Sequence, residues 1–372
     1  MASASPFGGS TGNRWLVPIL IVCALLCALS RADSGEPVWT VSAAPPMNSA
    51  RMGHESRLLP DGRVIVFGGH GSGFTALDSA EIWNPASGEF LPRAMAATHD
   101  GGALARLADG RYLLAGGAGD LGVAPGHSAA ELFDPRDGSF RVTGSLQRPR
   151  MSASAATLAD GSVLVVGGWY DDASAGAGER FDPASGTFAL TGALDSPRAR
   201  PVVLALDDGG ALVLGGYRPW GDGMVETVER YDPAGNRFSR VRPTLFGGEA
   251  GWLLRASNFA PPPQLADGRY LLLAYRPGDH GSAYALFTVD PASGEIARQT
   301  PSPALQDSAV AAWFPPLFDD TTGVAYLLGQ ALDGERALLR LRLLDVTDWA
   351  QTAPSVSYRL PADYYLGSAA AV

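Results

Sequence analysis

No lysine occurs in the chain, so all 28 basic residues are arginines. This absence excludes Schiff-base chemistry on the protein, a lysine general base and a Walker-type phosphate loop. Cysteine is nearly absent too: Cys23 and Cys27 share one apolar run, and the rest of the chain has no thiol, disulfide or cysteine-ligated metal. The net charge of -10 gives no basic surface of the kind that nucleic-acid binding requires, so no nucleic-acid partner is expected.

Apolar residues, by contrast, are plentiful. Hydrophobic residues make up 46% of the 372 positions, which suffices for a core that buries roughly 75% of the unfolded surface. The 46 glycines and 28 prolines together stay below the share that is typical of disordered, low-complexity chains. The composition therefore indicates a folded chain.

The N-terminus has the pattern of an export or anchoring segment. Residues 1–14 are polar and end in Arg14, residues 15–29 are continuously apolar, and small residues follow. This order is typical of a signal peptide. The apolar run is shorter than the roughly 20 residues of a membrane span. The alternative is an uncleaved anchor, in which case residues 15–29 would be the only part of the chain expected to contact a membrane. We divide the chain into a leader, 1–32, and a domain, 33–372, that is expected to be periplasmic, extracellular or membrane-tethered outside the cytoplasm.

The domain is an array of repeats. An Asp-Gly pair recurs, a short apolar run follows it, and four of the five runs end in a Gly pair. The Asp-Gly pairs begin at Asp61, Asp109, Asp160, Asp208 and Asp267, and the Gly pairs lie at 68–69, 116–117, 167–168 and 215–216. A variable loop then leads to Asn-Pro or Asp-Pro at 84–85, 134–135, 182–183, 232–233 and 290–291. A degenerate sixth copy begins near residue 308.

Each repeat holds four short apolar runs, here named a to d, that are separated by turn residues. Such spacing without helical periodicity predicts an all-β array, and four strands per repeat predict a β-propeller blade. The Gly pair permits close backbone approach at the end of strand b, and the Pro after strand c ends that strand because it cannot continue a ladder. We expect six blades, with seven as the alternative. Residues 38–42 are expected to complete the last blade, whereas 362–372 resemble the opening strand of a further one.

These residues resemble a known family. A strand b that ends in Gly-Gly and a strand c that ends in Phe/Tyr-Asp-Pro are similar to the kelch repeat, in particular to bacterial kelch repeats and the propeller of the galactose-oxidase family. The resemblance covers about residues 38–360 and implies the fold. It implies little about function, because kelch propellers include enzymes, glycan binders and protein-docking modules. The oxidase cofactor of that family needs a cysteine in the propeller, which this chain lacks, so we expect neither that copper site nor any other metal or cofactor.

Residues that recur at one repeat position are expected to build the fold. Four glutamates lie three residues before the Asn-Pro or Asp-Pro pair: Glu81, Glu131, Glu179 and Glu229. Three arginines share a position at the start of strand a: Arg51, Arg150 and Arg198. His99 occupies that position in the second repeat. One interpretation pairs the arginines with the glutamates between blades, and the other directs them into the central funnel as ligand-binding residues.

Residues that do not recur are the better candidates for function. The loops between strands b and c share one end of a propeller with the d-to-a connections; we call this end the b–c face. Its aromatic and arginine residues suit a polar ligand such as a sugar, since rings stack on apolar sugar faces and arginines bond hydroxyls. The candidates there are Trp169, Tyr170, Tyr217, Arg218, Trp220, Tyr275 and Arg276. A longer connection between the fourth and fifth repeats adds Trp252, with Glu249 nearby.

Three functions follow from these observations. The favoured one is a non-catalytic, exported propeller that binds a protein or glycan on the b–c face and at the central funnel. The alternative is a metal-free carbohydrate-active enzyme such as a sugar epimerase or mutarotase, with His99 or Glu249 as acid or base. The third is a purely architectural protein. No catalytic residue is assigned from the sequence.

Overall fold

The computed structural model is an all-β protein. It describes the backbone of residues 23–31, 37–119, 126–169, 175–219, 223–246, 249, 251–254, 262–265, 267–276 and 283–299, together with strands between residues 310 and 359. Side chains are described within the part of this set that runs from residue 45 to residue 299.

Five four-stranded antiparallel sheets form the blades of a β-propeller, and each is a meander of consecutive strands. Blade 1 contains β3 (Glu55–Leu58), β4 (Val64–Phe67), β5 (Ser79–Asn84) and β6 (Glu89–Ala94). Blade 2 contains β7 (Ala103–Arg106), β8 (Tyr112–Ala115), β9 (Ala130–Asp134) and β10 (Ser139–Val142). Blade 3 contains β11 (Ser154–Thr157), β12 (Val163–Val166), β13 (Ala177–Asp182) and β14 (Thr187–Ala193).

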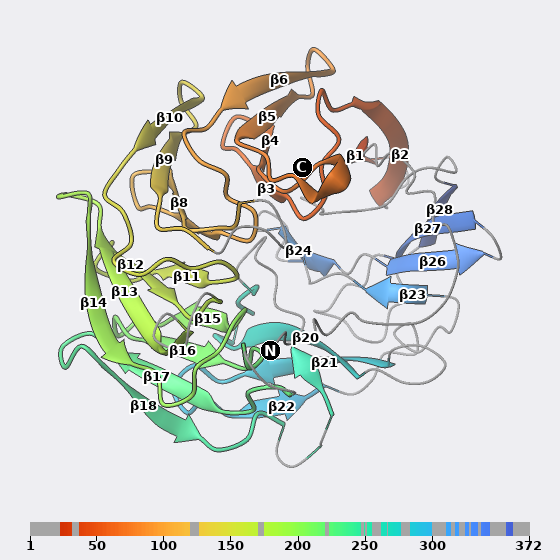
Figure 1. Cartoon of the computed structure of the whole chain (residues 1–372). Coiled ribbons are helices and arrows are strands. Elements are labelled where there is room, and N and C mark those ends of the chain that lie inside the picture. Colours follow the sequence, from red (N-terminus) through yellow and green to blue (C-terminus); the bar gives the residue numbers. More distant parts are fainter. Residues whose placement is uncertain are drawn as a thin grey trace, which may run out of the picture.

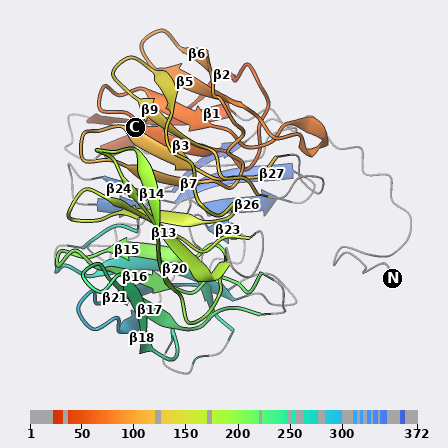
Figure 2. The same ribbon diagram turned by 60° about the vertical axis from the view of Figure 1, so that its left-hand side comes forward.

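Blades 4 and 5 continue the ring in the same way. Blade 4 contains β15 (Val202–Ala205), β16 (Ala211–Leu214), β17 (Val228–Asp232) and β18 (Arg237–Arg242). Blade 5 contains β19 (Leu253–Leu254), β20 (Tyr270–Arg276), β21 (Ala283–Val289) and β22 (Ile296–Arg298). In Figure 1 the blades follow one another in sequence order, from β3–β6 at the top to β19–β22 at the bottom. Figure 2 shows the same order of colours from a second side.

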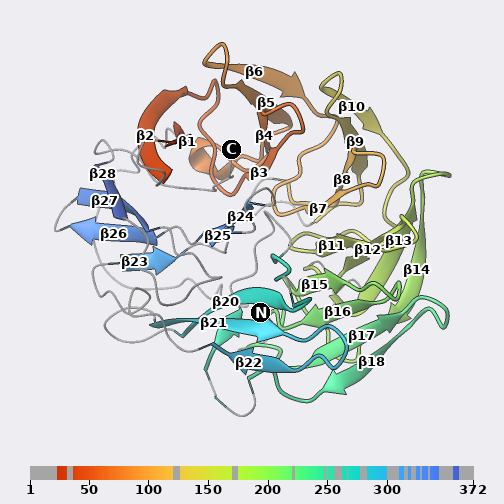
Figure 3. The same cartoon turned by 180° about the vertical axis from the view of Figure 1, so that it is seen from behind.

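The prediction of six or seven blades is wrong, because the meander ends after five. The next sheet has the order β23-β26-β27-β28, with β23 (Val310–Trp313), β26 (Gly329–Asp333), β27 (Arg336–Arg342) and β28 (Ser355–Arg359). The intervening β24 (Leu317–Asp319) and β25 (Val324–Tyr326) pair only with each other among the described strands, and they extend toward the middle of the ring in Figure 3. This copy also lacks the Gly pair that ends strand b in blades 1 to 4. The proposed extra strand at 362–372 lies outside the described residues.

The N-terminal strands do not complete a blade as expected. Residues 38–42 belong to β2 (Pro37–Pro46), which pairs with β1 (Cys23–Arg31) in a sheet of its own. This sheet lies between β28 and β6 in Figures 1 and 3. The described helical residues include no segment that is long and apolar enough to cross a membrane. The division into a leader and an exported domain stays a prediction.

Apolar side chains join neighbouring blades to one another. One buried cluster combines Ile65 and Phe67 of blade 1 with Leu114 and Phe133 of blade 2, and the rings of Phe67 and Phe133 meet edge to face at 5.5 Å. Corresponding clusters join blades 2 and 3, blades 3 and 4, and blades 4 and 5. Each meander buries its flat faces in this way, because a single blade would leave both exposed to water.

The Gly pairs explain how closely the blades approach. A Cβ on Gly116 would lie 2.4 Å from the carbonyl oxygen of Arg150 in the next blade, and a Cβ on Gly117 would lie 2.8 Å from Cα of His99 in its own blade. Both glycines have positive φ, at 69° and 124°, where a side chain is strained in any case. The predicted close approach at the end of strand b is confirmed. It involves the backbone of the same blade and the backbone that leads into the next blade.

Candidate functional site

The repeated arginines bind the repeated glutamates within a blade. Nη2 of Arg51 lies 2.9 Å from Oε1 of Glu81, and Nη2 of Arg150 lies 2.8 Å from Oε1 of Glu179. Arg198 and Glu229 form the same contact in blade 4. All six side chains are essentially inaccessible to solvent. The pairing is therefore confirmed, but each pair lies inside one blade and not between two blades as we expected.

Each glutamate also holds the chain that enters its blade. The backbone N–H groups of Asn48 and Ser49 donate to the carboxylate of Glu81. The amides of Gln147 and Arg148 donate to Glu179 in the same way. Because the guanidinium and the amides use the carboxylate oxygens, these carboxylates are saturated by internal bonds. We place Arg51, Arg150 and Arg198 in the framework of the blades and not in a ligand site.

His99 takes the same structural place in blade 2. Its Nδ1 lies 2.6 Å from the carbonyl oxygen of Gly116, and its Nε2 lies 3.2 Å from Oε1 of Glu131. Arg51 makes the equivalent two contacts, to the carbonyl oxygen of Gly68 and to its glutamate. Both ring nitrogens of His99 contact protein groups in this way, so the geometry leaves neither of them to act as an acid or base on a ligand.

A turn at the start of strand a marks the b–c face in each of the first four blades. Its central residue follows Arg51, His99, Arg150 or Arg198 by two positions and is left-handed: Gly53, Gly101, Ser152 and Arg200, with φ of 67°, 63°, 56° and 48°. Backbone bonds join the turns, since the N–H of Ser152 donates to Gly101 and the N–H of Arg200 donates to Ser152. Two blades thus keep a side chain where glycine would fit without strain, at a cost of roughly 1–2 kcal/mol per residue. Such strained positions cluster at functional sites.

Further side chains collect on the b–c face beside these turns. Trp169 and Tyr217 follow the Gly pairs of blades 3 and 4, and their rings meet edge to face at 6.4 Å. Both rings are half-buried and Arg218 is exposed. In blade 1, Phe74 is 52% exposed and left-handed, with φ of 61°. Tyr170 and Trp220 lie outside the described residues.

The long connection before blade 5 places its tryptophan in the core. Trp252 is 2% exposed and packs against Phe287. The guanidinium groups of Arg276 and Arg298 each lie 5.0 Å from its ring centroid, in the geometry of cation–π contacts. Glu249 accepts hydrogen bonds from the Trp252 indole and from Arg298. Trp252 therefore anchors the connection. Of the two neighbouring residues that were proposed for the b–c face, Arg276 is exposed and Tyr275 is half-buried.

Two buried titratable residues, His54 and Glu55, lie at the start of strand β3. Neither was among the candidates chosen from the sequence. Burial is the largest cause that lowers the pKa of His54, to about 4, and the nearby Arg51 lowers it further. Burial raises the pKa of Glu55 to about 8, against the lowering effects of Arg57 and Arg200. Oε2 of Glu55 lies 3.5 Å from Nη2 of Arg57, and neither carboxyl oxygen has a hydrogen bond within the described part of the chain. Two neighbouring groups whose pKa values move in opposite directions are a common feature of catalytic sites.

A second polar pair crosses from blade 1 to blade 2 on the same face. Nδ1 of His70 lies 3.1 Å from Oδ2 of Asp100, and both side chains are buried. Burial raises the pKa of Asp100, while His70 and Arg200 act in the opposite direction. Arg200 therefore influences both Glu55 and Asp100. These groups form one electrostatic cluster around the turns of the b–c face.

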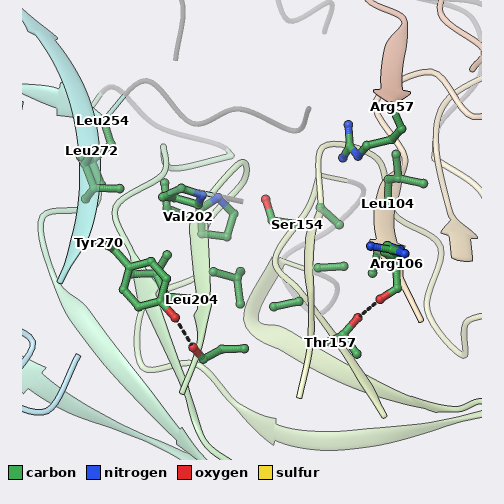
Figure 4. A pocket seen from close by; sticks show the side chains of 18 of the residues that line it. Arg57, Leu104, Arg106, Ser154, Thr157, Val202, Leu204, Leu254, Tyr270 and Leu272 are labelled. Carbon is green, nitrogen blue, oxygen red and sulfur yellow. Dashed lines mark hydrogen bonds between the residues drawn. The ribbon is translucent and has the colours of Figure 1, made fainter. Parts of the chain in front are cut away.

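The first strands of the blades surround a central channel of about 470 Å³. Figure 4 shows Arg57 and Arg106 on one side of it and Leu254, Leu272 and Tyr270 on the other. Ser154 projects between the two sides. Within the described residues, no group of three or more His, Cys, Asp or Glu side chains is placed to hold a metal ion.

Neither a protein-family model nor a curated protein matches the chain. The kelch-like and galactose-oxidase-like resemblance consequently rests on the repeat motifs, and the structure establishes the β-propeller.

The strained turns do have a signal in the sequence. The residue two positions after Arg51, His99, Arg150 and Arg198 is Gly, Gly, Ser and Arg in order. An aligned position that changes from glycine to a large side chain marks a departure from the framework. His54 and Glu55 have no comparable signal, because their shifts in pKa arise from burial.

Proposed function

We propose that this propeller is a binding module that takes a protein or glycan ligand on its b–c face. One observation carries the proposal. Three of the four left-handed non-glycine residues in the described chain, Phe74, Ser152 and Arg200, lie at this one end of the blades. The fourth, Asn236, is a residue type that tolerates this conformation in turns.

The chemistry of the face suits a polar ligand with apolar surfaces. Trp169, Tyr217 and the exposed Phe74 offer ring faces and edges, while Arg200 and Arg218 are exposed hydrogen-bond donors. Arginine presents a planar fork that matches carboxylates and paired hydroxyls. A β-propeller often serves as a rigid platform for binding. Export, which rests on the apolar run at 15–29, is part of the proposal, because an extracellular setting would present such ligands.

Binding to a glycan array and to immobilised extracts of the cell envelope would test the proposal. We expect the double variant Trp169→Ala/Arg218→Ala to lose retained ligand by about tenfold or more. Val142→Ala is the matched control, because Val142 is 71% exposed on the outer strand of blade 2. Equal retention by the double variant and the control would refute a ligand site on the b–c face.

A metal-free carbohydrate-active enzyme is the second candidate, and the buried pair His54 and Glu55 favours it. Glu55 retains its proton near neutral pH, as a general acid must, because burial raises its pKa to about 8. Arg200 is close enough to lower that pKa. NMR measurement of anomer interconversion with a panel of sugars tests this candidate. Acceleration that is lost in Glu55→Gln would support it, and rates equal to buffer would dismiss it for those sugars.

A further inference from the structure

One polar pair on the b–c face occupies positions that other blades give to apolar or aromatic residues. In each of the first four blades an isolated antiparallel bridge joins the residue after the Gly pair to the residue that precedes the left-handed residue of the turn. The four bridges are Met52–His70, Asp100–Ala118, Met151–Trp169 and Ala199–Tyr217. Because the same bridge forms with Met–Trp and Ala–Tyr pairs, the backbone requires neither the imidazole of His70 nor the carboxylate of Asp100.

The contact between these two side chains leaves one nitrogen of His70 without a partner. Nδ1 lies 3.1 Å from Oδ2 of Asp100, and a carboxylate only accepts, so this contact places the ring hydrogen on Nδ1. Nε2 then carries a lone pair, and it has no hydrogen-bond partner among the described residues although it is buried. A buried acceptor in this state lowers stability, and a ligand that donates to it restores the missing bond.

Glycine at the turn of blade 1 makes room for this pair. A Cβ on Gly53 would lie 3.2 Å from Cε1 of His70 and 3.4 Å from Oδ1 of Asp100. In blades 3 and 4 the same turn position carries Ser152 and Arg200, in spite of the positive φ. The turn, the imidazole and the carboxylate of the pair are therefore closely packed, which fixes the orientation of the imidazole.

The ring of Phe74 lies against the imidazole of His70. The ring centroids are 5.5 Å apart and the ring planes make an angle of 33°. Phe74 ends the short 3-10 turn η1 (Ser72–Phe74), and it is both left-handed and 52% exposed. A bulky residue rarely adopts this conformation. The protein thus holds an exposed aromatic ring beside the histidine although the backbone there is strained.

We propose that Nε2 of His70 accepts a hydrogen bond from the phenolic hydroxyl of a tyrosine that a protein partner presents to the b–c face. The inference rests on the proposed function and narrows its ligand to a protein. One acceptor beside an aromatic ring fits a ligand with one hydroxyl on an otherwise apolar ring. A sugar would bring several hydroxyls to the same place and leave most of them unpaired, at a cost in affinity. The incoming ring displaces Phe74 from the imidazole and relieves the strain at that residue.

The probe is p-cresol, which reproduces the tyrosine side chain, and 4-methylanisole is its counterpart that cannot donate. NMR titration of the full chain is expected to show p-cresol binding at least about tenfold more tightly than 4-methylanisole. The double variant His70→Ala/Asp100→Ala should lose this preference. It should remain folded, with a urea midpoint no lower than that of the wild type, because blades 2 and 4 carry alanine at the same two positions.

Two further variants locate the probe. Phe74→Gly removes the ring that lies against the imidazole and is expected to strengthen p-cresol binding about threefold or more. His127→Gln is the matched control, because this histidine on the same face already has partners at both ring nitrogens. Its Nε2 lies 2.5 Å from the carbonyl oxygen of Thr98, and the amide of Ala129 donates to its Nδ1. The control is expected to bind p-cresol as the wild type does.

Several results would overturn the inference. They are p-cresol that binds no better than 4-methylanisole, a folded double variant that binds p-cresol as the wild type does, and weaker or equal binding by Phe74→Gly. Tighter binding of methyl β-D-glucopyranoside than of p-cresol would overturn it in favour of a sugar. Failure of the proposed function has a different signature: p-cresol would still bind, while Trp169→Ala/Arg218→Ala would retain ligand as its control does.

Discussion

His99 and Glu131 reproduce in blade 2 the contact that an arginine and a glutamate make in blades 1, 3 and 4. Nε2 of His99 lies 3.2 Å from Oε1 of Glu131. Burial opposes ionisation of Glu131, but hydrogen bonds from His99 and from the amides of Ala96 and Ala97 outweigh it and hold the pKa of this carboxyl below its usual range. The other nitrogen of His99 faces the carbonyl oxygen of Gly116, which only accepts. Both ring nitrogens of His99 are therefore engaged inside blade 2.

Replacement of His99 should therefore follow hydrogen-bonding capacity more closely than size. We expect His99→Arg to stay within about 1 kcal/mol of the wild type, because it restores the pair of the other blades. His99→Leu leaves the buried Glu131 carboxylate without the side chain that it contacts in the wild type, and a loss of about 3 kcal/mol is expected. Urea unfolding followed by tryptophan fluorescence measures both. Equal losses for the two variants would contradict the assignment of a hydrogen-bonding role to this position.

The buried arginine–glutamate pairs should contribute far more to the free energy of unfolding than the external arginine–aspartate pairs. Glu179→Gln deprives Arg150 of its carboxylate in a site closed to solvent, and the free energy of unfolding is expected to fall by about 3–5 kcal/mol. Asp160→Asn breaks the half-exposed pair with Arg180, where less than about 1 kcal/mol is expected. Thermal unfolding of the two variants, side by side, gives the comparison. A similar loss for both would mean that the internal pair adds nothing beyond an external one.

Alanine variants of Gly69 and Gly62 distinguish the cost of a steric clash from the cost of backbone strain. Both have positive φ, at 78° and 83°. A Cβ on Gly69 would lie 2.5 Å from the carbonyl oxygen of Met52 and 2.8 Å from the amide nitrogen of His54, whereas a Cβ on Gly62 meets no atom within 4 Å. Gly62→Ala should cost about 1–2 kcal/mol. Gly69→Ala should cost clearly more, since the backbone of Met52 and His54 must also move, and chemical denaturation of both variants tests the difference.

Stability should decline between pH 6.5 and 8 because of Glu55. Its pKa is about 8 in the folded protein against an ordinary 4.5. Over this window the folded state holds a proton that the unfolded chain releases, so the free energy of unfolding falls as pH rises. His54 acts in the opposite direction, but only between its folded pKa of about 4 and its ordinary 6.5. Above pH 6.5 the effect of Glu55 is unopposed by His54.

Glu55→Gln is the appropriate variant for this pH effect, because it keeps the neutral form at every pH. We expect urea midpoints of the wild type to fall from pH 6.5 to pH 8, while those of Glu55→Gln change much less. Glu249→Gln serves as the control, since Glu249 is partly exposed and bonded to Arg298. Parallel pH profiles for the wild type and Glu55→Gln would show that Glu55 does not titrate in this window.

The strained turns predict a conflict between stability and binding. Ser152→Gly and Arg200→Gly each introduce the residue that blades 1 and 2 use at the same position, where φ is positive. Each is expected to raise the free energy of unfolding, or to leave it unchanged within about 1 kcal/mol. Arg200→Gly should at the same time reduce ligand retention on the b–c face. A variant that loses stability by more than about 1 kcal/mol would show that the side chain supports the fold.

The periodic part of the sequence predicted the fold well, since each motif has a local mechanical reason. The Gly pair at 116–117 adjoins two backbones, and Pro135 directly follows the end of β9. The prediction became wrong where the repeat decays: β24 and β25 interrupt the sheet that follows blade 5, and the sequence there lacks the Gly pair that ends strand b in blades 1 to 4.

The candidate site was harder to predict, because exposure depends on packing across blades. Trp252 lies in an insertion, which suggested a binding loop, yet it is buried against Phe287. Trp169 and Tyr217 do lie on the b–c face, within contact of each other. Glu55 gave no signal, since an isolated glutamate at the start of a strand ordinarily faces solvent, and only the neighbouring strands determine that it is buried.

The confinement of each arginine–glutamate pair to one blade has a consequence for how such a chain evolves. The amides at Asn48 and Ser49, the guanidinium of Arg51 and the carboxylate of Glu81 all lie within one contiguous stretch of about one repeat. Duplication or loss of a whole repeat in the gene therefore carries each buried arginine together with its glutamate. The remaining contacts between blades are largely apolar and tolerate substitution. Ring size can thus change by recombination without separating any of these arginine–glutamate pairs.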